Sequence, residues 1–229
     1  GQIYKAEALL RWKHPERGYV SPADFIPLAE ETGLIIEISD WMFAKILPLV
    51  SEWRQHFHPD FQVSINTSPV QYKQDTGNIS SWLTQLQDNT QESSPVAFEI
   101  TENLLMENKG DLTELLFNLQ EAGISIAIDD FGTGYSSLSY LQNYQADYLK
   151  IDISFVQKLT RKSDDATLCE AIVVMAKKLG IEVIAEGIET EEQQQILKGM
   201  ECDYGQGYLL SKPLEAQDLE DFLSSYNCE

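Results

Sequence analysis

Cationic residues are scarce in this chain. Its 229 residues include 16 lysines and arginines against 37 aspartates and glutamates, which gives a formal net charge of −21 at pH 7. A surface that binds a nucleic-acid backbone needs clustered Lys and Arg side chains. The composition therefore argues against a broad nucleic-acid surface, and a phosphate-bearing ligand would need a local source of positive charge.

Cysteine, histidine and long apolar runs are scarce as well. The three cysteines, Cys169, Cys202 and Cys228, have no CxxC spacing, which predicts reduced thiols in a cytosolic protein and leaves no recognisable zinc motif. The three histidines fall in expected loops or helix ends and are predicted to be surface residues. No apolar run approaches the roughly 20 residues that cross a bilayer, so we expect no membrane contact from this chain.

The chain does contain a repeated pattern, in which apolar runs end in acidic residues. The runs end at Glu7, at Glu99 and Glu102, at Asp129 and Asp130, at Asp152, and at Glu186 and Glu189. Runs such as 124–128 and 181–185 are typical of strands buried on both faces, where an ionised carboxylate is costly unless it is paired or bound to a metal. The intervals between the acids leave room for a strand, a loop and a helix that returns to the next parallel strand, which is the spacing of a (β/α) barrel.

Seven strands are predicted, and each carries a polar residue: Glu7, Asn66, Glu99, Asp129, Lys150, Glu186 and Gln206, the last in a strand over 204–213. Helices are predicted over 22–31, 40–54, 79–87, 111–122, 137–142, 164–179, 191–198 and 216–226, with Ser21 as the first N-cap and a polar loop over 88–94. A closed barrel has eight strands. We therefore expect one α/β domain over 1–229, a modified (β/α)8 TIM-type barrel whose first strand is missing, excised from a longer protein.

Residues at the carboxyl ends of barrel strands converge on one pocket. That pocket would gather Glu7, Asn66, Glu99, Asp129, Asp130, Lys150, Asp152, Glu186 and Gln206. Several carboxylates within a few ångströms repel one another, so they must take up protons or hold cations. Oxygen ligands without histidine favour Mg²⁺ or Mn²⁺ over zinc, with Ca²⁺ as a competitor. The adjacent pair of aspartates suits a site for two ions.

These residues also have purely structural interpretations. Asp130, Asn66 and Gln206 could each belong to a turn. Glu7 and Glu99 could face solvent between the barrel and its helices, and a lysine at position 150 could form a structural ion pair. The repetition of acids on several strands favours a shared site.

The segment 132–137, with sequence GTGYSS, lacks the lysine of a phosphate-cradling loop, which argues against a Walker-type nucleotide site. Glycine and serine tolerate the backbone changes that a mobile lid requires. We expect a lid here that includes Thr133 and Ser136. Glu102, one strand away, is expected to accept hydrogen bonds from it.

Together these motifs resemble those of the bacterial EAL-domain phosphodiesterases, which hydrolyse cyclic di-GMP to the linear dinucleotide pGpG. The motifs occur in one order across nearly the whole chain: EALLRW at 7–12, SPADFIPLAEETGLI at 21–35, INTSP at 65–69, FEITE at 98–102, DDFGTGYSSL at 129–138, KID at 150–152, EGIET at 186–190 and QGYLLSKP at 206–213.

The resemblance implies a two-metal mechanism with Mg²⁺ or Mn²⁺, in which Ca²⁺ is expected to inhibit. One ion would be held by Glu7, Asn66, Glu99 and Asp129, and the other by Asp129, Asp130 and Glu186. The nucleophile would be a water between the ions, contacted by Lys150, with Glu186 as its proposed base and Gln206 completing the catalytic site.

The resemblance further implies that Arg11 contacts a substrate phosphate, that Glu189, Tyr208 and Asp152 lie near the substrate, and that Glu102 holds the lid, which contributes to dimer contacts. A homodimer is therefore expected, with a regulatory sensor or GGDEF domain elsewhere in a bacterial cytoplasmic protein whose full length could be membrane-anchored. Two alternatives remain open: a non-catalytic cyclic di-GMP receptor, and a Schiff-base lyase that uses Lys150 as its nucleophile.

Overall fold

The computed structural model describes residues 2–73, 78–87, 94–107, 111–132, 141, 146–160 and 163–226. The chain divides into two compact units. Unit 1 comprises Gly1–Phe98, Leu119–Ile124 and Glu215–Glu229, and unit 2 comprises Glu99–Asn118 and Ser125–Leu214. A single domain over 1–229 stays a prediction.

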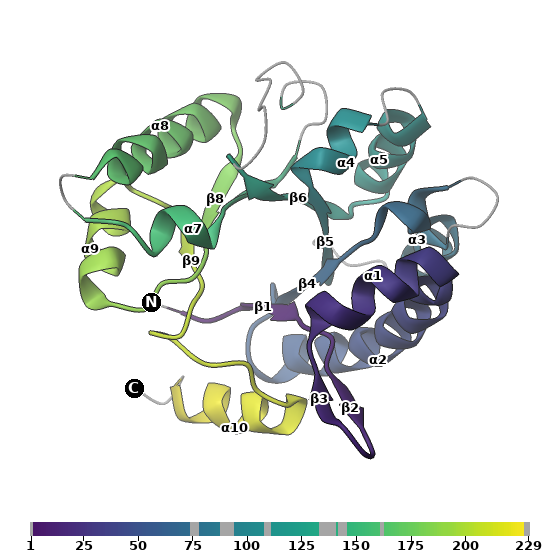
Figure 1. Ribbon diagram of the computed structural model, residues 1–229. Helices are drawn as coiled ribbons and strands as arrows, with labels where there is room; N and C mark the ends of the chain where they lie inside the picture. Colours follow the sequence, from purple (N-terminus) through teal and green to yellow (C-terminus); the bar gives the residue numbers. More distant parts are fainter. Residues whose placement is uncertain are drawn as a thin grey trace. The chain divides into compact units, whose positions relative to one another are not determined.

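The main sheet has seven strands in the order β1-β4-β5-β6-β7-β8-β9 (Figure 1). The pairs β1–β4, β6–β7, β7–β8 and β8–β9 are parallel. The order in the sheet follows the order in the chain, as successive strand–helix–strand units require. All seven predicted strands are present, which confirms the α/β prediction.

Within its described residues, unit 1 contains a hairpin, four complete α-helices and a short 3₁₀ helix besides its strands. In chain order they are β1 (Lys5–Ala8), β2 (Trp12–His14), β3 (Gly18–Val20), α1 (Pro22–Thr32), α2 (Leu34–His56), β4 (Gln62–Asn66), η1 (Pro69–Tyr72), α3 (Ile79–Gln87) and α10 (Ala216–Tyr226), and β5 (Val96–Thr101) begins in this unit. The core includes Phe43, whose ring stacks on that of Trp82 with centroids 4.3 Å apart.

Helix α1 begins as predicted, because Ser21 Oγ accepts a hydrogen bond from Ala23 N at 3.3 Å and a proline takes the first helical position. The helix ends at Gly33, whose φ of +78° favours glycine. Helix α2 follows at once from Leu34, so the predicted start at residue 40 was wrong. The reason is that Ile35 is already buried in the core, which extends the apolar stripe of the helix toward its start.

Unit 2 contains the remaining strands together with several helices. It contains α4 (Glu102–Glu107), β6 (Ser125–Phe131), β7 (Tyr148–Ile151), α7 (Ile153–Val156), α8 (Asp164–Leu179), β8 (Glu182–Ala185), α9 (Glu191–Gly199) and β9 (Tyr204–Gly205), and α5 (Asp111–Glu121) begins here. Helix α8 packs against β7 and β8. Its bounds are those predicted, because Ser163 caps its start and Gly180, at φ +77°, its end.

Some predicted elements differ from the structure or lie outside the described residues. The loop over 88–94 and the helix over 137–142 lie largely outside them, as does Cys228. Within the described part, Cys169 and Cys202 form no disulfide. The hairpin β2–β3 was not predicted, because strands of three residues are too short to show an alternating pattern. In the residues that the structure describes, no helix is both long and apolar enough to cross a membrane.

The last strand is shorter than predicted. Only Tyr204–Gly205 pairs as β9, whereas a strand was expected over 204–213. Beyond it the chain turns, because the carbonyl oxygen of Gly207 accepts hydrogen bonds from Leu210 N at 3.0 Å and Ser211 N at 3.2 Å. A Cβ atom at Gly207 would lie 2.2 Å from the backbone nitrogen and oxygen of Ile188, so only glycine fits this turn.

We expect Gly207→Ala to lower the free energy of unfolding by about 3 kcal/mol or more, because the backbone of unit 2 must shift to admit a methyl group. The matched control is Gly199→Ala at the end of α9, where an added Cβ meets nothing within 4 Å. That control should change stability by less than about 1 kcal/mol. Urea denaturation of both variants and the wild type measures these changes. Equal denaturation midpoints for Gly207→Ala and Gly199→Ala would contradict the crowding at Gly207.

Candidate active site

The polar residues predicted as a site stand at corresponding ends of neighbouring strands. In unit 2, Lys150 on β7 pairs in register with Ile184 on β8, so that Glu186 follows the end of β8 near the end of β7. Asp129 lies in β6, where the register with β7 shifts between Ile128 and Phe131. Strand alternation thus brings charged side chains of several strands to one place within this unit.

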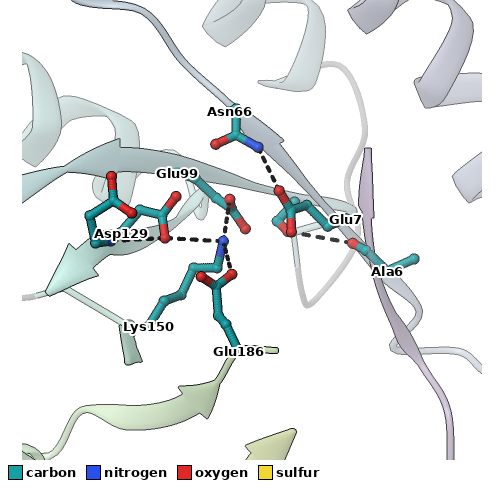
Figure 2. Close-up of polar contacts among 9 residues, drawn as sticks. Ala6, Glu7, Asn66, Glu99, Asp129, Lys150 and Glu186 are labelled. Atoms are coloured by element: carbon teal, nitrogen blue, oxygen red, sulfur yellow. Dashed lines mark hydrogen bonds and ion pairs between the residues drawn. The ribbon is translucent and has the colours of Figure 1, made fainter. Parts of the chain in front are cut away.

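Lys150 lies at the centre of a group of three carboxylates. Its Nζ atom is 2.5 Å from Glu99 Oε2, 2.8 Å from Glu186 Oε1 and 3.2 Å from Asp129 Oδ1. Figure 2 shows the three acids pointing toward the ammonium group. Lys150 is only 1% exposed and Glu99 only 2%, so their charges are shielded from water. These four residues are called the Lys150 cluster below.

The Lys150 cluster has an excess of negative charge. Three ionised carboxylates and one ammonium group carry a formal net charge of −2. A buried excess of this kind is stabilised by protons or by further cations. All acceptors are carboxylate oxygens, which match Mg²⁺, Mn²⁺ or Ca²⁺ rather than zinc. The donor chemistry therefore fits a hard divalent cation.

The arrangement of these side chains is that of an ion-pair cluster. Among the described residues, no group of three or more His, Cys, Asp or Glu side chains is arranged to hold a metal ion. The three acids of the Lys150 cluster each contact the ammonium group of Lys150. It is the type of ligand atom, and the charge around it, that fit a divalent ion.

Asp130 occupies a strained position beside the cluster. Its φ is +55°, a value that is uncommon for a residue other than glycine, and its backbone N donates to Asp129 Oδ1 at 3.0 Å. Partial burial, followed by the charges of Asp129 and Asp152, raises the pKa of the Asp130 carboxyl group above its ordinary value. The irregularity in β6 interrupts the regular alternation of side chains between the two faces of the sheet at Asp129 and Asp130. Such interruptions are common near functional sites.

Asp152 has a clear local role. Its Oδ1 accepts a hydrogen bond from Ser154 N at 2.9 Å and caps the short helix α7. This contact alone explains an acid at the position, because aspartate is a favoured N-cap residue. A role near the substrate stays a prediction.

In unit 1, Glu7 and Asn66 form a pair. Asn66 Nδ2 donates to Glu7 Oε1 at 2.7 Å, as Figure 2 shows. The pair is built by parallel strands in register, since Glu7 on β1 lies opposite Ser64 on β4. Because the amide nitrogen of Asn66 binds the carboxylate, its carbonyl oxygen is the atom that can serve as a neutral ligand for a hard cation.

Glu102 holds the first residue of the predicted lid. It is 6% exposed, it begins α4, and its Oε2 accepts a hydrogen bond from Gly132 N at 3.1 Å. Gly132 has a φ of +96°, which favours glycine. Thr133 and Ser136, the other predicted lid residues, lie outside the described residues.

Gln206 and Glu189 are held by backbone contacts. The backbone N of Gln206 donates to Ala185 O at 2.8 Å, and its carbonyl oxygen accepts from Ile188 N at 3.0 Å. Glu189 N donates to Gln193 Oε1 at 2.8 Å, while the Glu189 side chain is exposed. These contacts place both residues beside the end of β8, and the roles of their side chains stay predictions.

Arg11 and Tyr208 are exposed side chains. Arg11 Nη1 donates to Leu10 O at 2.8 Å, and Tyr208 is 60% exposed, with Lys212 Nζ 6.0 Å from its ring centroid. An exposed guanidinium and an exposed phenol ring are both available to a ligand with phosphates and bases. Their contact with a substrate stays a prediction.

A buried hydrogen-bond network follows Asn66 and was not predicted from the sequence. It includes Ser68 and Gln71, the two members of a capping box at η1. The spacing Ser-x-x-Gln directly after a predicted strand is the sequence signal that points to this capping box.

Comparisons with known proteins agree with this fold. The family model described as "EAL domain" matches residues 1–213. The "Bifunctional diguanylate cyclase/cyclic di-GMP phosphodiesterase MucR" of Pseudomonas aeruginosa is 39% identical over 219 residues, which are 96% of this chain and 32% of that protein. This chain thus spans about a third of the length of the curated relatives that it matches first.

Two solved structures are informative. "PaMucR Phosphodiesterase, c-di-GMP complex" is 40% identical, has a TM-score of 0.86 and covers 93% of this chain and 86% of that chain. "Klebsiella pneumoniae BlrP1 pH 8.0 calcium/cy-diGMP complex" is 29% identical, with a TM-score of 0.66 and coverage of 78% and 43%. These likenesses confirm the predicted TIM-type fold class. With the family model matched over residues 1–213, the chain belongs to the EAL domain family.

Proposed function

We propose that this chain is a divalent-metal-dependent phosphodiesterase that hydrolyses cyclic di-GMP to linear pGpG. The observation that carries the proposal is the Lys150 cluster, in which a buried ammonium group contacts three carboxylates that retain an excess of negative charge. Membership of the EAL domain family supports it, because relatives in that family are named as cyclic di-GMP phosphodiesterases.

In unit 2 the proposed metal ligands are Glu99, Asp129, Asp130 and Glu186. The family resemblance adds Glu7 and Asn66 of unit 1, whose hydrogen bond leaves the amide oxygen as a ligand atom. When bound, two Mg²⁺ or Mn²⁺ ions would neutralise the phosphodiester and lower the pKa of a bound water.

The chain's own residues would orient and move the proton of the attacking water. Lys150 Nζ donates a hydrogen bond to this water, and Glu186, held 2.8 Å from that ammonium group, accepts the proton. The water oxygen would form a bond to phosphorus as the bond from phosphorus to the 3′ oxygen breaks. The leaving oxygen would take up a proton from solvent, and Glu186 would return its proton to solvent. Linear pGpG with a 5′ phosphate and a free 3′ hydroxyl results.

Substrate contacts are proposed for the residues that the resemblance implies. Arg11 binds a phosphate, Gln206 completes the catalytic site, and Asp152, Glu189 and Tyr208 lie near the bases and riboses. A homodimer and a place within a longer bacterial cytoplasmic protein with a regulatory domain are part of the same proposal.

The Schiff-base alternative is disfavoured by the contacts of Lys150. A lysine nucleophile must be a neutral amine. Three carboxylates within 3.2 Å instead stabilise the charged ammonium form. Borohydride should therefore trap no adduct on Lys150.

Incubation with cyclic di-GMP and Mg²⁺ or Mn²⁺, followed by chromatography of the products, tests the proposed activity. We expect pGpG to form, and to disappear when the metal is chelated. Saturable binding of cyclic di-GMP without any product would instead show a receptor domain, and neither binding nor turnover would refute the proposal.

Calcium should replace magnesium without supporting turnover. Ca²⁺ binds oxygen ligands at about 2.3–2.6 Å with loose geometry, whereas Mg²⁺ holds them at about 2.1 Å in an octahedron. We expect hydrolysis in Ca²⁺ alone to be at least about 100-fold slower, because the larger ion polarises bound water less. Rates at increasing Mg²⁺ with fixed Ca²⁺ should show competition, and calorimetry should still detect substrate binding. Equal turnover in calcium alone would contradict the proposed metal centre.

Removing the Glu102 side chain should slow hydrolysis because the first residue of the predicted lid loses its hydrogen bond. Glu102→Ala deletes the acceptor for Gly132 N and should lower kcat/KM about tenfold. Glu102→Gln retains an acceptor oxygen and should lie closer to the wild type. Hydrogen exchange at Gly132 should rise in the alanine variant only. Unchanged exchange together with weaker metal binding would instead assign Glu102 to the metals.

A further inference from the structure

In unit 1, a series of hydrogen bonds through two buried amide side chains follows Asn66 in the sequence. It runs from Ser68, after β4, through Gln71 on η1 and Asn78 at the start of α3, to Asp40 on α2. Gln71 is 1% exposed and Asn78 is 7% exposed. These two side chains are called the amide relay below.

Every polar end of the amide relay has a partner. Gln71 Oε1 accepts from Ser68 N at 2.9 Å, and Gln71 Nε2 donates to Asn78 Oδ1 at 3.0 Å. Asn78 Nδ2 donates to Asp40 Oδ1 at 2.7 Å, and the same oxygen accepts from Trp82 Nε1 at 2.6 Å. The relay therefore connects the backbone of Ser68 to the carboxylate of Asp40, which in turn binds the buried indole of Trp82.

Both residues that follow Asn66 are also held by their side chains. Ser68 Oγ donates to Glu30 Oε1 at 2.7 Å, and Thr67 Oγ1 lies 2.8 Å from Tyr72 Oη, with which it shares a hydrogen bond. Thr67 is 8% and Ser68 7% exposed. The segment that carries Asn66 is thus fixed from α1, from η1 and, through the relay, from α2 and α3.

A helix cap alone does not explain this arrangement. The capping box of η1 ends at Gln71, yet the hydrogen bonds continue through Asn78 to Asp40. Buried amides cost free energy unless all their groups are paired, and apolar side chains would fill the same space at lower cost. A fully paired network of this kind is suited to holding a nearby ligand residue in one orientation.

We propose that Gln71 and Asn78 are positioning residues that hold the Asn66 carboxamide in its contact with Glu7 and thereby set the cation affinity of the Glu7–Asn66 pair. This inference rests on the proposed function, in which the pair supplies metal ligands. The two residues touch neither substrate nor metal and act only through the segment 66–68.

Titration with Mn²⁺, followed by electron paramagnetic resonance of the free ion, tests the proposal without relying on turnover. Gln71→Leu should weaken Mn²⁺ binding about tenfold, as loss of an outer contact to a metal ligand does. Its kcat at saturating Mn²⁺ should stay near that of the wild type, and the KM for cyclic di-GMP should be unchanged. The matched control is Val50→Ala, a truncation of a fully buried side chain on α2, which should lower Tm yet leave Mn²⁺ affinity within about twofold.

A second pair of variants keeps the test decisive if Gln71→Leu does not fold. Asn78→Ala removes the acceptor for Gln71 Nε2 and the donor to Asp40 Oδ1, and it should also weaken Mn²⁺ binding. Glu30→Gln lies outside the relay and keeps an acceptor oxygen for Ser68 Oγ, so it should not. Wild-type Mn²⁺ affinity in folded Gln71→Leu or Asn78→Ala would overturn the positioning role. Asn66→Ala separates the two levels: if it binds Mn²⁺ as the wild type does, the ligand role in the proposed function fails, and the inference fails with it.

Discussion

Lys150→Met is expected to lower kcat for cyclic di-GMP hydrolysis by about 1,000-fold while KM changes less than about threefold. Methionine preserves most of the aliphatic packing of this buried side chain but removes the ammonium group that contacts Glu99, Asp129 and Glu186. The attacking water then loses its proposed hydrogen-bond donor, and the three acids lose the cation between them.

Steady-state kinetics at saturating Mn²⁺ make this measurement. Lys177→Met is the matched control, because Lys177 forms an ion pair with Glu201 at 2.8 Å on the exposed end of α8. That variant should retain wild-type kinetics. An unchanged kcat with a raised KM for Lys150→Met would make Lys150 a binding residue instead.

Glu7→Gln should reduce Mn²⁺ affinity about 100-fold and turnover at limiting metal by a similar factor. Glutamine keeps an oxygen to accept the hydrogen bond from Asn66 Nδ2, so the pair and the strand β1 should keep their shape. What is lost is one negative charge that would balance a divalent ion.

The control for this change is Glu52→Gln, an exposed glutamate on α2 that removes the same charge from the chain. Tm should be nearly the same for the wild type and both variants, which separates metal binding from folding. Hydrolysis by Glu7→Gln at the wild-type rate under limiting metal would rule out Glu7 as a ligand.

The residues at the strand ends show how much of the candidate site could be predicted from the sequence pattern. Glu99, Asp129, Lys150 and Glu186 were predicted together because parallel strands end at one edge of a sheet. The contacts that each of these side chains makes were not predictable from the sequence. A catalytic role for Lys150 was favoured over a structural ion pair. The observed contacts are compatible with both, since they are ion pairs within a cluster that has excess negative charge.

At Asp130 and Gln206 the observed backbone differs from the regular strand that the sequence pattern predicted. The register in β6 shifts at the point where Asp130 adopts a positive φ. The last strand stops at Gly205 because the chain must turn at Gly207. Both features depend on close contacts with other segments. A pattern of apolar residues along the chain contains no information about those contacts.

By itself the sequence determined the α/β class, the order of the strands and most helix bounds, because hydrophobic period and capping are set by residues close together in the chain. Only the tertiary structure decided that Glu99 reaches Lys150, 51 positions away, and that Trp82 reaches Asp40, 42 positions away. Such contacts depend on how strands and helices pack, and a shift of less than an ångström makes or breaks a hydrogen bond.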